Sequence, residues 1–113
     1  ILVGDSPKYI FGIIDLCIDI NYRSKNIAST LLEKITILGE RNNIDYLLLF
    51  ANNHRLYNKN NFKPISTYCS WLKINNHKNY GVAFEEIKNE IMIKELGQNK
   101  WENKPIDFLG YLF

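Results

Sequence analysis

The feature of this sequence that most constrains its fold is a change of hydrophobic period along residues 9–51. Residues 9–20 are rich in β-branched and aromatic side chains, and from Ile14 onward apolar and polar residues alternate, which is typical of a strand. Residues 27–38 place apolar side chains three and four positions apart and predict an amphipathic helix that ends near residues 41–43. Residues 45–51 form a short apolar run that predicts a strand covered on both faces. This order predicts a βαβ unit with roughly parallel strands.

The first of these strands has one apolar face and one polar face. The apolar face carries Ile14, Leu16, Ile18 and Ile20. The opposite face carries Asp15, Cys17 and Asp19 and is polar enough to line a site. The helix that follows ends at Asn42 and Asn43, and this pair suits a left-handed exit because Asn tolerates positive φ better than most residues.

Three further elements are expected downstream. Asn52 and Asn53 suit the cap of a short helix over residues 54–60. Bulky side chains predict a strand over residues 65–75. Residues 90–96 fit either a helix or a strand, and the Ile-Met-Ile run followed by Gly97 favours the strand.

The remaining segments predict a loop and a docked tail. Residues 76–83 are expected to form a loop. Residues 101–113 carry several large apolar side chains, and so much apolar area is expected to dock onto the core instead of facing water.

Composition excludes several classes of protein. The 113 residues amount to one domain, and 46% hydrophobic with 23% charged residues excludes wholesale disorder. No apolar run has the length of a membrane-spanning helix, and a net charge of +2 is too balanced to favour nucleic acid as a partner. Cys17 and Cys69 have no metal-ligand spacing, so no metal site is expected. They are typical of reduced cytosolic thiols, with a disulfide between them left open.

The junction between the first strand and the first helix is the clearest candidate site. The first turn of a helix has unpaired backbone N–H groups and the positive end of the helix dipole, so it attracts anions. Arg23 and Lys25 add positive charge there, and a pyrophosphate bound along residues 23–29 is physically reasonable. The alternative is an ordinary solvated turn that carries two basic residues.

At this junction the sequence resembles a known family. Residues 18–32, which read IDINYRSKNIASTLL, resemble the acetyl-CoA motif of the GNAT acetyltransferase superfamily. Arg23 matches the first basic position of that motif and Ala28 its last small position, whereas Asn26 stands where Gly is usual. Residues 107–113 also look like the ends of some small bacterial members of the family.

A second motif lies downstream. Residues 56–62, LYNKNNF, are similar to the family's Leu-Tyr-x-x-x-Gly-Phe, with Asn61 in place of Gly. Both changes from Gly to Asn are mild where the backbone is left-handed, because Asn is the next most tolerant residue. They are not mild where the Gly allows close approach to phosphate, so Asn26 bears on cofactor affinity more than on the fold.

The resemblance implies an α/β fold of the GNAT type. Such a fold has a mixed, mostly antiparallel central sheet with flanking helices and a parallel βαβ cofactor-binding unit. Residues 1–113 would then be a single acyl-CoA N-acyltransferase domain whose N-terminal elements are missing. The reason is that the family places several strands and one or two helices before the strand that holds Ile18.

The resemblance also implies where acetyl-CoA would bind as co-substrate. The main chain near Cys17 and Ile18 would pair with the pantetheine arm, and an N–H there would polarise the thioester carbonyl. Asn53 would contact the pantetheine region. The pyrophosphate would be held by the residues of the turn and first helical turn: Arg23, Ser24, Lys25, Asn26, Ile27, Ala28 and Ser29.

For catalysis, the resemblance implies that Tyr57 protonates the leaving thiolate. The alternative is that Tyr57 only packs its ring on the sheet. Asp15 is the first candidate for the base that deprotonates the acceptor, with Asp19, His54 or a residue upstream of Ile1 as alternatives. Cys17 is interpreted as a packing residue.

The expected function is therefore an N-acetyltransferase that transfers an acetyl group from acetyl-CoA to a primary amine by direct attack, in the cytoplasm. The acceptor would be a small molecule or a peptide; neither nucleic acid nor a membrane is an expected partner, and a homodimer is left open. The alternative is a catalytically weak or inactive GNAT-like module that binds CoA or a partner protein. Asn26 and the apolar tail favour this alternative.

Overall fold

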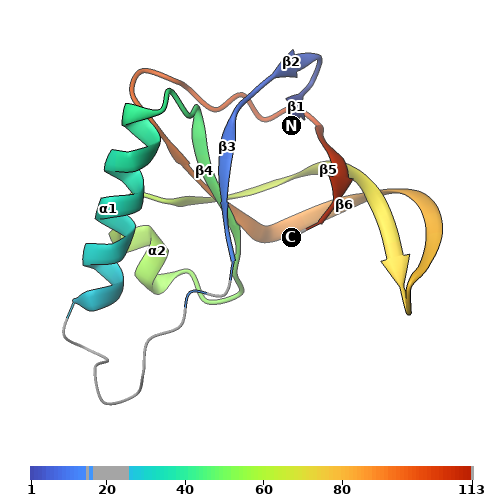
Figure 1. The fold of residues 1–113 in the computed structure, drawn as a ribbon, viewed down its shortest axis with the longest axis horizontal. Coiled ribbons are helices and arrows are strands. Elements are labelled where there is room, and N and C mark those ends of the chain that lie inside the picture. The colour runs from blue at the N-terminus through green and yellow to red at the C-terminus, as the bar shows by residue number, and fades with distance from the viewer. Residues whose placement is uncertain (15, 17–25, 113) are drawn as a thin grey trace.

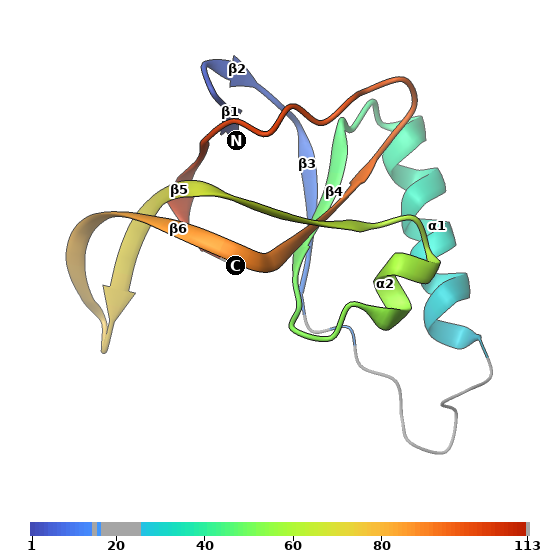
Figure 2. The same ribbon diagram turned by 180° about the vertical axis from the view of Figure 1, so that it is seen from behind.

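A computed structural model of the chain describes residues 1–14, 16 and 26–112. Within these residues, one seven-stranded mixed sheet packs against two helices, and a long hairpin extends away from the helices (Figures 1 and 2). The strand order across the sheet is β2-β1-β7-β5-β6-β4-β3. The elements along the chain are β1 (Leu2–Val3), β2 (Ser6–Pro7), β3 (Ile10–Ile13), α1 (Ile27–Arg41), β4 (Tyr46–Phe50), α2 (Arg55–Lys59), β5 (Lys63–Asn75), β6 (Lys78–Glu95) and β7 (Ile106–Tyr111).

The strands on either side of α1 in the sequence are neighbours in the sheet. β3 and β4 pair in parallel, from Ile10 opposite Tyr46 to Ile13 opposite Leu49. β5 and β7 form the second parallel pair among the described residues, and the other pairs are antiparallel. The fold is therefore a mixed α and β fold with a mixed sheet, in agreement with the class expected from the sequence.

The helix α1 ends in the left-handed exit that the sequence predicts. Asn43 adopts a φ of 55°, its N–H donates to the carbonyl of Glu40, and the N–H of Ile44 donates to the carbonyl of Gly39. These bonds form a Schellman cap with Asn43 in the left-handed position. Gly39 itself lies against the sheet, since a Cβ there would stand 2.7 Å from Cδ1 of Leu96.

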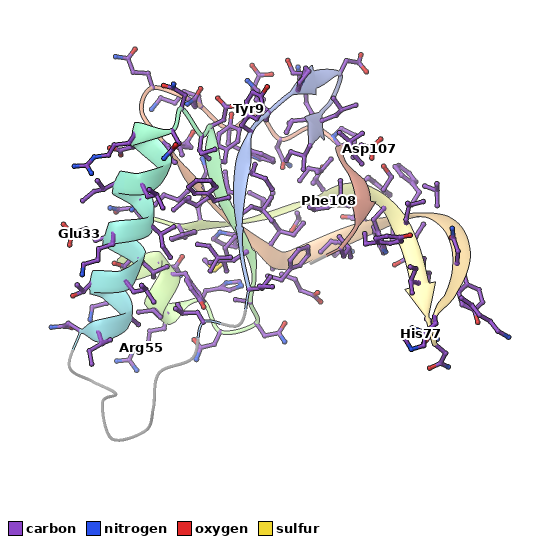
Figure 3. All side chains as sticks on the ribbon, in the orientation of Figure 1. Tyr9, Glu33, Arg55, His77, Asp107 and Phe108 are labelled. Carbon is purple, nitrogen blue, oxygen red and sulfur yellow. The ribbon has the colours of Figure 1, made fainter. Side chains whose placement is uncertain are left out.

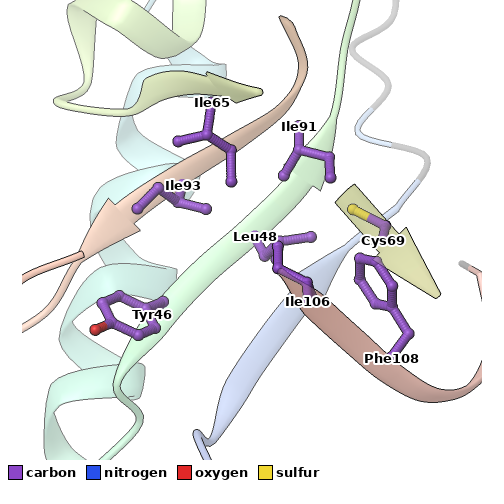
Figure 4. Packing of buried hydrophobic residues seen from close by; sticks show 8 residues of the cluster. All are labelled: Tyr46, Leu48, Ile65, Cys69, Ile91, Ile93, Ile106 and Phe108. Atoms are coloured by element: carbon purple, nitrogen blue, oxygen red, sulfur yellow. The ribbon is translucent and has the colours of Figure 1, made fainter. Parts of the chain in front are cut away.

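The core consists of two apolar clusters on the two faces of β4 and β6. The helix-side cluster contains Leu32, Leu47, Leu49, Phe62, Met92 and Leu96. The opposite cluster contains Tyr46, Leu48, Ile65, Cys69, Ile91, Ile93, Ile106 and Phe108 (Figure 4). Successive residues of β4 alternate between the two clusters, and Tyr46 to Leu49 are at most 2% exposed. This confirms the prediction of a strand covered on both faces.

The prediction of a loop over residues 76–83 is wrong for most of this segment, because a strand occupies it from Lys78 onward. Only Asn76 and His77 form the turn, with φ values of 49° and 62°, and β6 begins at Lys78. Two consecutive left-handed residues make a tight hairpin turn whose twist matches the flanking strands. The strand pairing therefore continues through a polar stretch that lacks the usual alternation. The strands expected over residues 65–75 and 90–96 are both present.

The apolar tail docks as expected, by adding a strand. β7 inserts between β1 and β5, and its Ile106 and Phe108 are buried. Upstream of β7, the Trp101 ring meets Tyr46 edge to face, with centroids 5.2 Å apart. The prediction holds only for part of the tail, because Leu109 and Tyr111 are 64% and 55% exposed.

The first predicted strand is described only in part. β3 ends at Ile13, and Ile14, which was expected on the apolar face, is 60% exposed. Phe11 and Ile13 pack against the helix-side cluster, so the alternation turns Ile14 away from it. Leu16 packs on the helix-side cluster as predicted. Residues 15 and 17–20 lie outside the described part of the chain.

Candidate functional site

The residue that precedes α1 has a left-handed backbone. Asn26 is left-handed, with φ 57° and ψ 19°, and its carbonyl accepts the N–H of Thr30 at 2.9 Å. Asn26 therefore stands at a position where Gly and Asn are the residues best tolerated. Because the backbone is left-handed here, Asn in place of Gly is a mild change for the fold.

Among the described residues, the first turn of α1 carries no group that would repel an anion. The Asn26 side chain makes no capping hydrogen bond, and the turn contains no acidic residue. The first N–H groups of a helix have no partner within it, and they lie at the positive end of the helix dipole. Ile27 is 39% exposed, and Ala28 and Ser29 are half-buried, so the turn lies at the surface.

The second motif is held beside the first by a side-chain contact. Nδ2 of Asn60 donates to Oγ of Ser29 at 3.1 Å and to the carbonyl of Leu56 at 2.9 Å. This joins the end of α2 to the first turn of α1. The structure thus brings Ser29 of the expected pyrophosphate site close to the helix that carries Tyr57. Sequence reasoning missed Asn60, although it lies inside the quoted motif.

Tyr57 packs its ring in the way the alternative interpretation predicts. The ring lies partly buried on the helix-side cluster and meets Phe62 edge to face, with centroids 5.8 Å apart at 72°. Asn61 is left-handed with a φ of 67°, so the second Gly position of the motif also has the geometry that Asn tolerates. The packing of Tyr57 is established, and its role as an acid stays a prediction.

Asn53 and His54 shape the start of α2. Oδ1 of Asn53 accepts the N–H of Arg55 at 3.1 Å, so Asn53 supports the helix start as expected, although His54 occupies the cap position itself. Nε2 of His54 lies 3.1 Å from the carbonyl oxygen of Ala51. A carbonyl only accepts, so Nε2 is the donor in this contact.

Several expected site residues lie outside the described part of the chain. They are Asp15, Cys17, Ile18, Asp19, Arg23, Ser24 and Lys25. Their predicted roles stay predictions.

One charged residue in this layer was missed by the sequence reasoning. Nζ of Lys94 donates to Oγ1 of Thr36 at 3.0 Å and lies 5.9 Å from the centroid of the Phe62 ring. Burial lowers the pKa of Lys94, against the opposing effect of Glu40 and Glu33. The signal for it was a lysine that directly follows the Ile-Met-Ile run, at a position where the strand faces α1.

A hollow of about 500 Å³ lies at the other end of α1 and is lined in part by Glu40, Asp45 and Glu95. Two of these carboxylates are already engaged. Asp45 accepts the N–H of Tyr9 at 2.8 Å, and Glu95 accepts the N–H of Trp101 at 2.6 Å. The Trp101 N–H is the main cause of the lowered pKa of Glu95. No group of three or more potential ligands in the described residues has a geometry that could hold a metal ion.

Comparison with known proteins identifies no family for this chain. No family model and no curated protein matches the chain. The resemblance therefore depends on the residues themselves. In the described part of the chain, no helix is long and apolar enough to cross a membrane.

Proposed function

We propose that this protein is an acetyl-CoA-dependent N-acetyltransferase with a GNAT-like fold, and that α1 begins at its cofactor site. The observation that carries the proposal is the left-handed Asn26 at the uncapped start of α1. Both motif positions where the family usually has Gly, Asn26 and Asn61, are left-handed. Left-handed Asn also occurs outside the motifs, at Asn43, Asn76 and Asn89, so the support comes from the position of Asn26 and Asn61 where the motifs have Gly.

The pyrophosphate of acetyl-CoA supplies the anion for this site. The first N–H groups of α1 and the helix dipole favour negative charge, and Arg23 and Lys25 precede the helix in the sequence. In this proposal Ser29 is kept in place by Asn60, so that its N–H can bind a phosphate oxygen.

The end of the β3–β4 pairing supports a place for the pantetheine arm. The parallel register stops at Ile13 opposite Leu49, whereas β4 continues to pair with β6 through Phe50. In this proposal an extended ligand adds to backbone groups beyond the described end of the β3–β4 pairing, as a strand would. We assign this pairing to the region of Cys17 and Ile18.

The proposed reaction is the direct attack of a primary amine on the thioester of acetyl-CoA. The amine loses a proton to a base, for which Asp15 is the candidate, and its nitrogen bonds to the carbonyl carbon. The C–S bond then breaks, and Tyr57 donates its proton to the leaving thiolate. The acceptor is a small molecule or a peptide amine.

Calorimetry with acetyl-CoA tests the binding part of the proposal. We expect saturable binding, and no binding at millimolar acetyl-CoA would contradict it. Tyr57→Phe is expected to bind as the wild type does but to lose turnover, whereas Tyr9→Phe, which changes a Tyr that is 74% exposed, is the matched control. Unchanged turnover in Tyr57→Phe would remove Tyr57 from the mechanism.

A CoA-binding module without transferase activity is the second candidate. Two observations favour it: Asn26 places a side chain where the family has none, and the Tyr57 ring is packed against Phe62. Binding of acetyl-CoA without thiol release across a panel of amines would support this function over the transferase.

A further inference from the structure

The outer half of the β5–β6 hairpin extends beyond the rest of the sheet. β4 pairs with β6 only over Ile91–Glu95, so among the described strands the outer part of β6 has β5 as its sole neighbour. His77 marks the tip in Figure 3, far from both helices. A two-stranded ribbon is marginally stable by itself, which makes the faces of this hairpin notable.

One face of the hairpin carries a contiguous apolar surface, here called the hairpin patch. It consists of Tyr68, Leu72, Ile74, Val82, Phe84 and Tyr111. Cross-strand pairing places these side chains on one face, since Leu72 lies opposite both Val82 and Tyr111. The rings of Tyr68 and Phe84 stack with centroids 5.3 Å apart and planes 13° apart.

The area of the hairpin patch suits an interface. Apart from the half-buried Leu72, its side chains are 48–70% exposed. At 150–250 Å² for each fully exposed ring, the three half-exposed rings present roughly 300 Å², and the aliphatic side chains bring the apolar surface of the patch to roughly 500 Å². Two such patches together would bury about 1,000 Å², the lower limit for a specific interface between proteins.

The acidic side chains on the face of the hairpin patch lie at its base. Glu86 lies opposite Tyr68 and Asp107 lies opposite Ser70, so both carboxylates share the face of the patch. Toward the tip, residues 70–84 contain no acidic residue, and Lys73 and Lys78 lie on the opposite face, because Lys73 stands between Leu72 and Ile74 and Lys78 pairs with Asn75. A second copy that packs on the patch in antiparallel orientation keeps the two acidic bases apart, whereas a parallel orientation would bring like charges together.

We propose that the hairpin patch is the interface of a twofold symmetric homodimer, with two hairpins packed face to face and antiparallel. A twofold axis makes one patch serve both copies, as in most soluble homodimers. Pairing along the free edge of β6 is disfavoured, because that edge carries Glu85, Glu86 and Lys88. The modest area predicts a dimer that dissociates in the micromolar range.

Sedimentation velocity of the full chain over a concentration series tests this proposal. We expect a shift from 13.3 kDa to twice that mass as concentration rises. Phe84→Ser is expected to raise the dissociation constant by at least about tenfold. Leu38→Ser, at a residue of α1 that is 54% exposed, is the control and should leave it unchanged. A single-chain mass throughout, or equal effects of the two variants, would overturn the proposal.

Glu86→Gln tests the antiparallel orientation separately. In that orientation the Glu86 side chains of the two copies are far apart, so this change should leave the dissociation constant nearly unchanged. In a parallel orientation the change would remove repulsion between like charges, and a clearly stronger dimer would rule out the antiparallel arrangement.

Discussion

Tyr57 and Phe62 are joined through both their backbones and their rings. The N–H of Phe62 donates to the carbonyl of Tyr57 at 3.0 Å, and the two rings meet edge to face with centroids 5.8 Å apart. Between them, Asn61 is left-handed and its N–H donates to the carbonyl of Asn58. Together these contacts form a Schellman cap with its accompanying apolar contact. The spacing of Tyr and Phe in the second motif therefore has a structural reason that is independent of catalysis.

The cap at the end of α2 predicts that replacing Asn61 and replacing Asn58 affect the stability of the protein differently. Asn61→Ala should lower the free energy of unfolding by about 1 kcal/mol. The reason is that Ala tolerates the left-handed backbone conformation less well than Asn, whose polar side chain can hydrogen-bond to the local backbone. Asn61→Gly should stay within about 0.5 kcal/mol of the wild type. Asn58→Ala, inside the helix, is the control and should not destabilise. Urea unfolding measures all three, and equal losses for both Ala variants would contradict the assignment.

The left-handed start of α1 predicts the effect of restoring a glycine there. Asn26→Gly should strengthen acetyl-CoA binding severalfold, because it removes a side chain from the place where phosphate would approach the backbone. Asn43→Gly makes the same change at the left-handed exit of the same helix and should leave binding unchanged. Calorimetry compares the two variants. An unaltered dissociation constant in Asn26→Gly would argue against phosphate binding at this turn.

Cys69 predicts a loss of stability in alkaline solution. Burial raises the pKa of its thiol to about 11. The folded state therefore keeps this proton at a pH where the unfolded chain releases it, so stability is fully present below the ordinary thiol pKa. It falls as pH rises toward 11, by about 2–3 kcal/mol in all.

Unfolding titrations from neutral to alkaline pH measure this loss. Cys69→Ala should begin less stable than the wild type, because Cys69 is fully buried, but it should lack this part of the alkaline decline. Parallel declines in the two proteins would show that the thiol does not contribute.

The partly buried Lys94 has the opposite effect from Cys69 on how stability depends on pH. Burial lowers its pKa, so the unfolded chain binds this proton more readily than the folded protein does. Its contribution to stability therefore rises as pH increases through the folded pKa toward the ordinary lysine value. Lys94→Met should lack this rise, and the exposed Lys88→Met should keep it. The difference between wild-type and variant titrations isolates the effect, and a flat difference would contradict it.

Much of the local structure could be predicted from the sequence, because it depends on contacts between near neighbours. The three- and four-residue period of residues 27–38 specifies α1, and Asn43 specifies its left-handed end. The apolar run of β4 specifies a strand buried on both faces. Propensity for positive φ also accounts for the conformations of Asn26 and Asn61, since few other residues tolerate them.

Only the tertiary structure showed which segments become strands by pairing with segments that are distant in the sequence. Nothing local in residues 76–83 indicates a strand, and β6 extends through them because β5 offers hydrogen bonds across a two-residue turn. In the same way, β7 is a strand because β1 and β5 leave a place between them. Ile14 is exposed because Phe11 and Ile13 of β3 face the helix-side cluster, and the alternation of the strand turns the next side chain away from it. Local periodicity reports which side chains need cover, whereas only the assembled sheet determines which segment covers them.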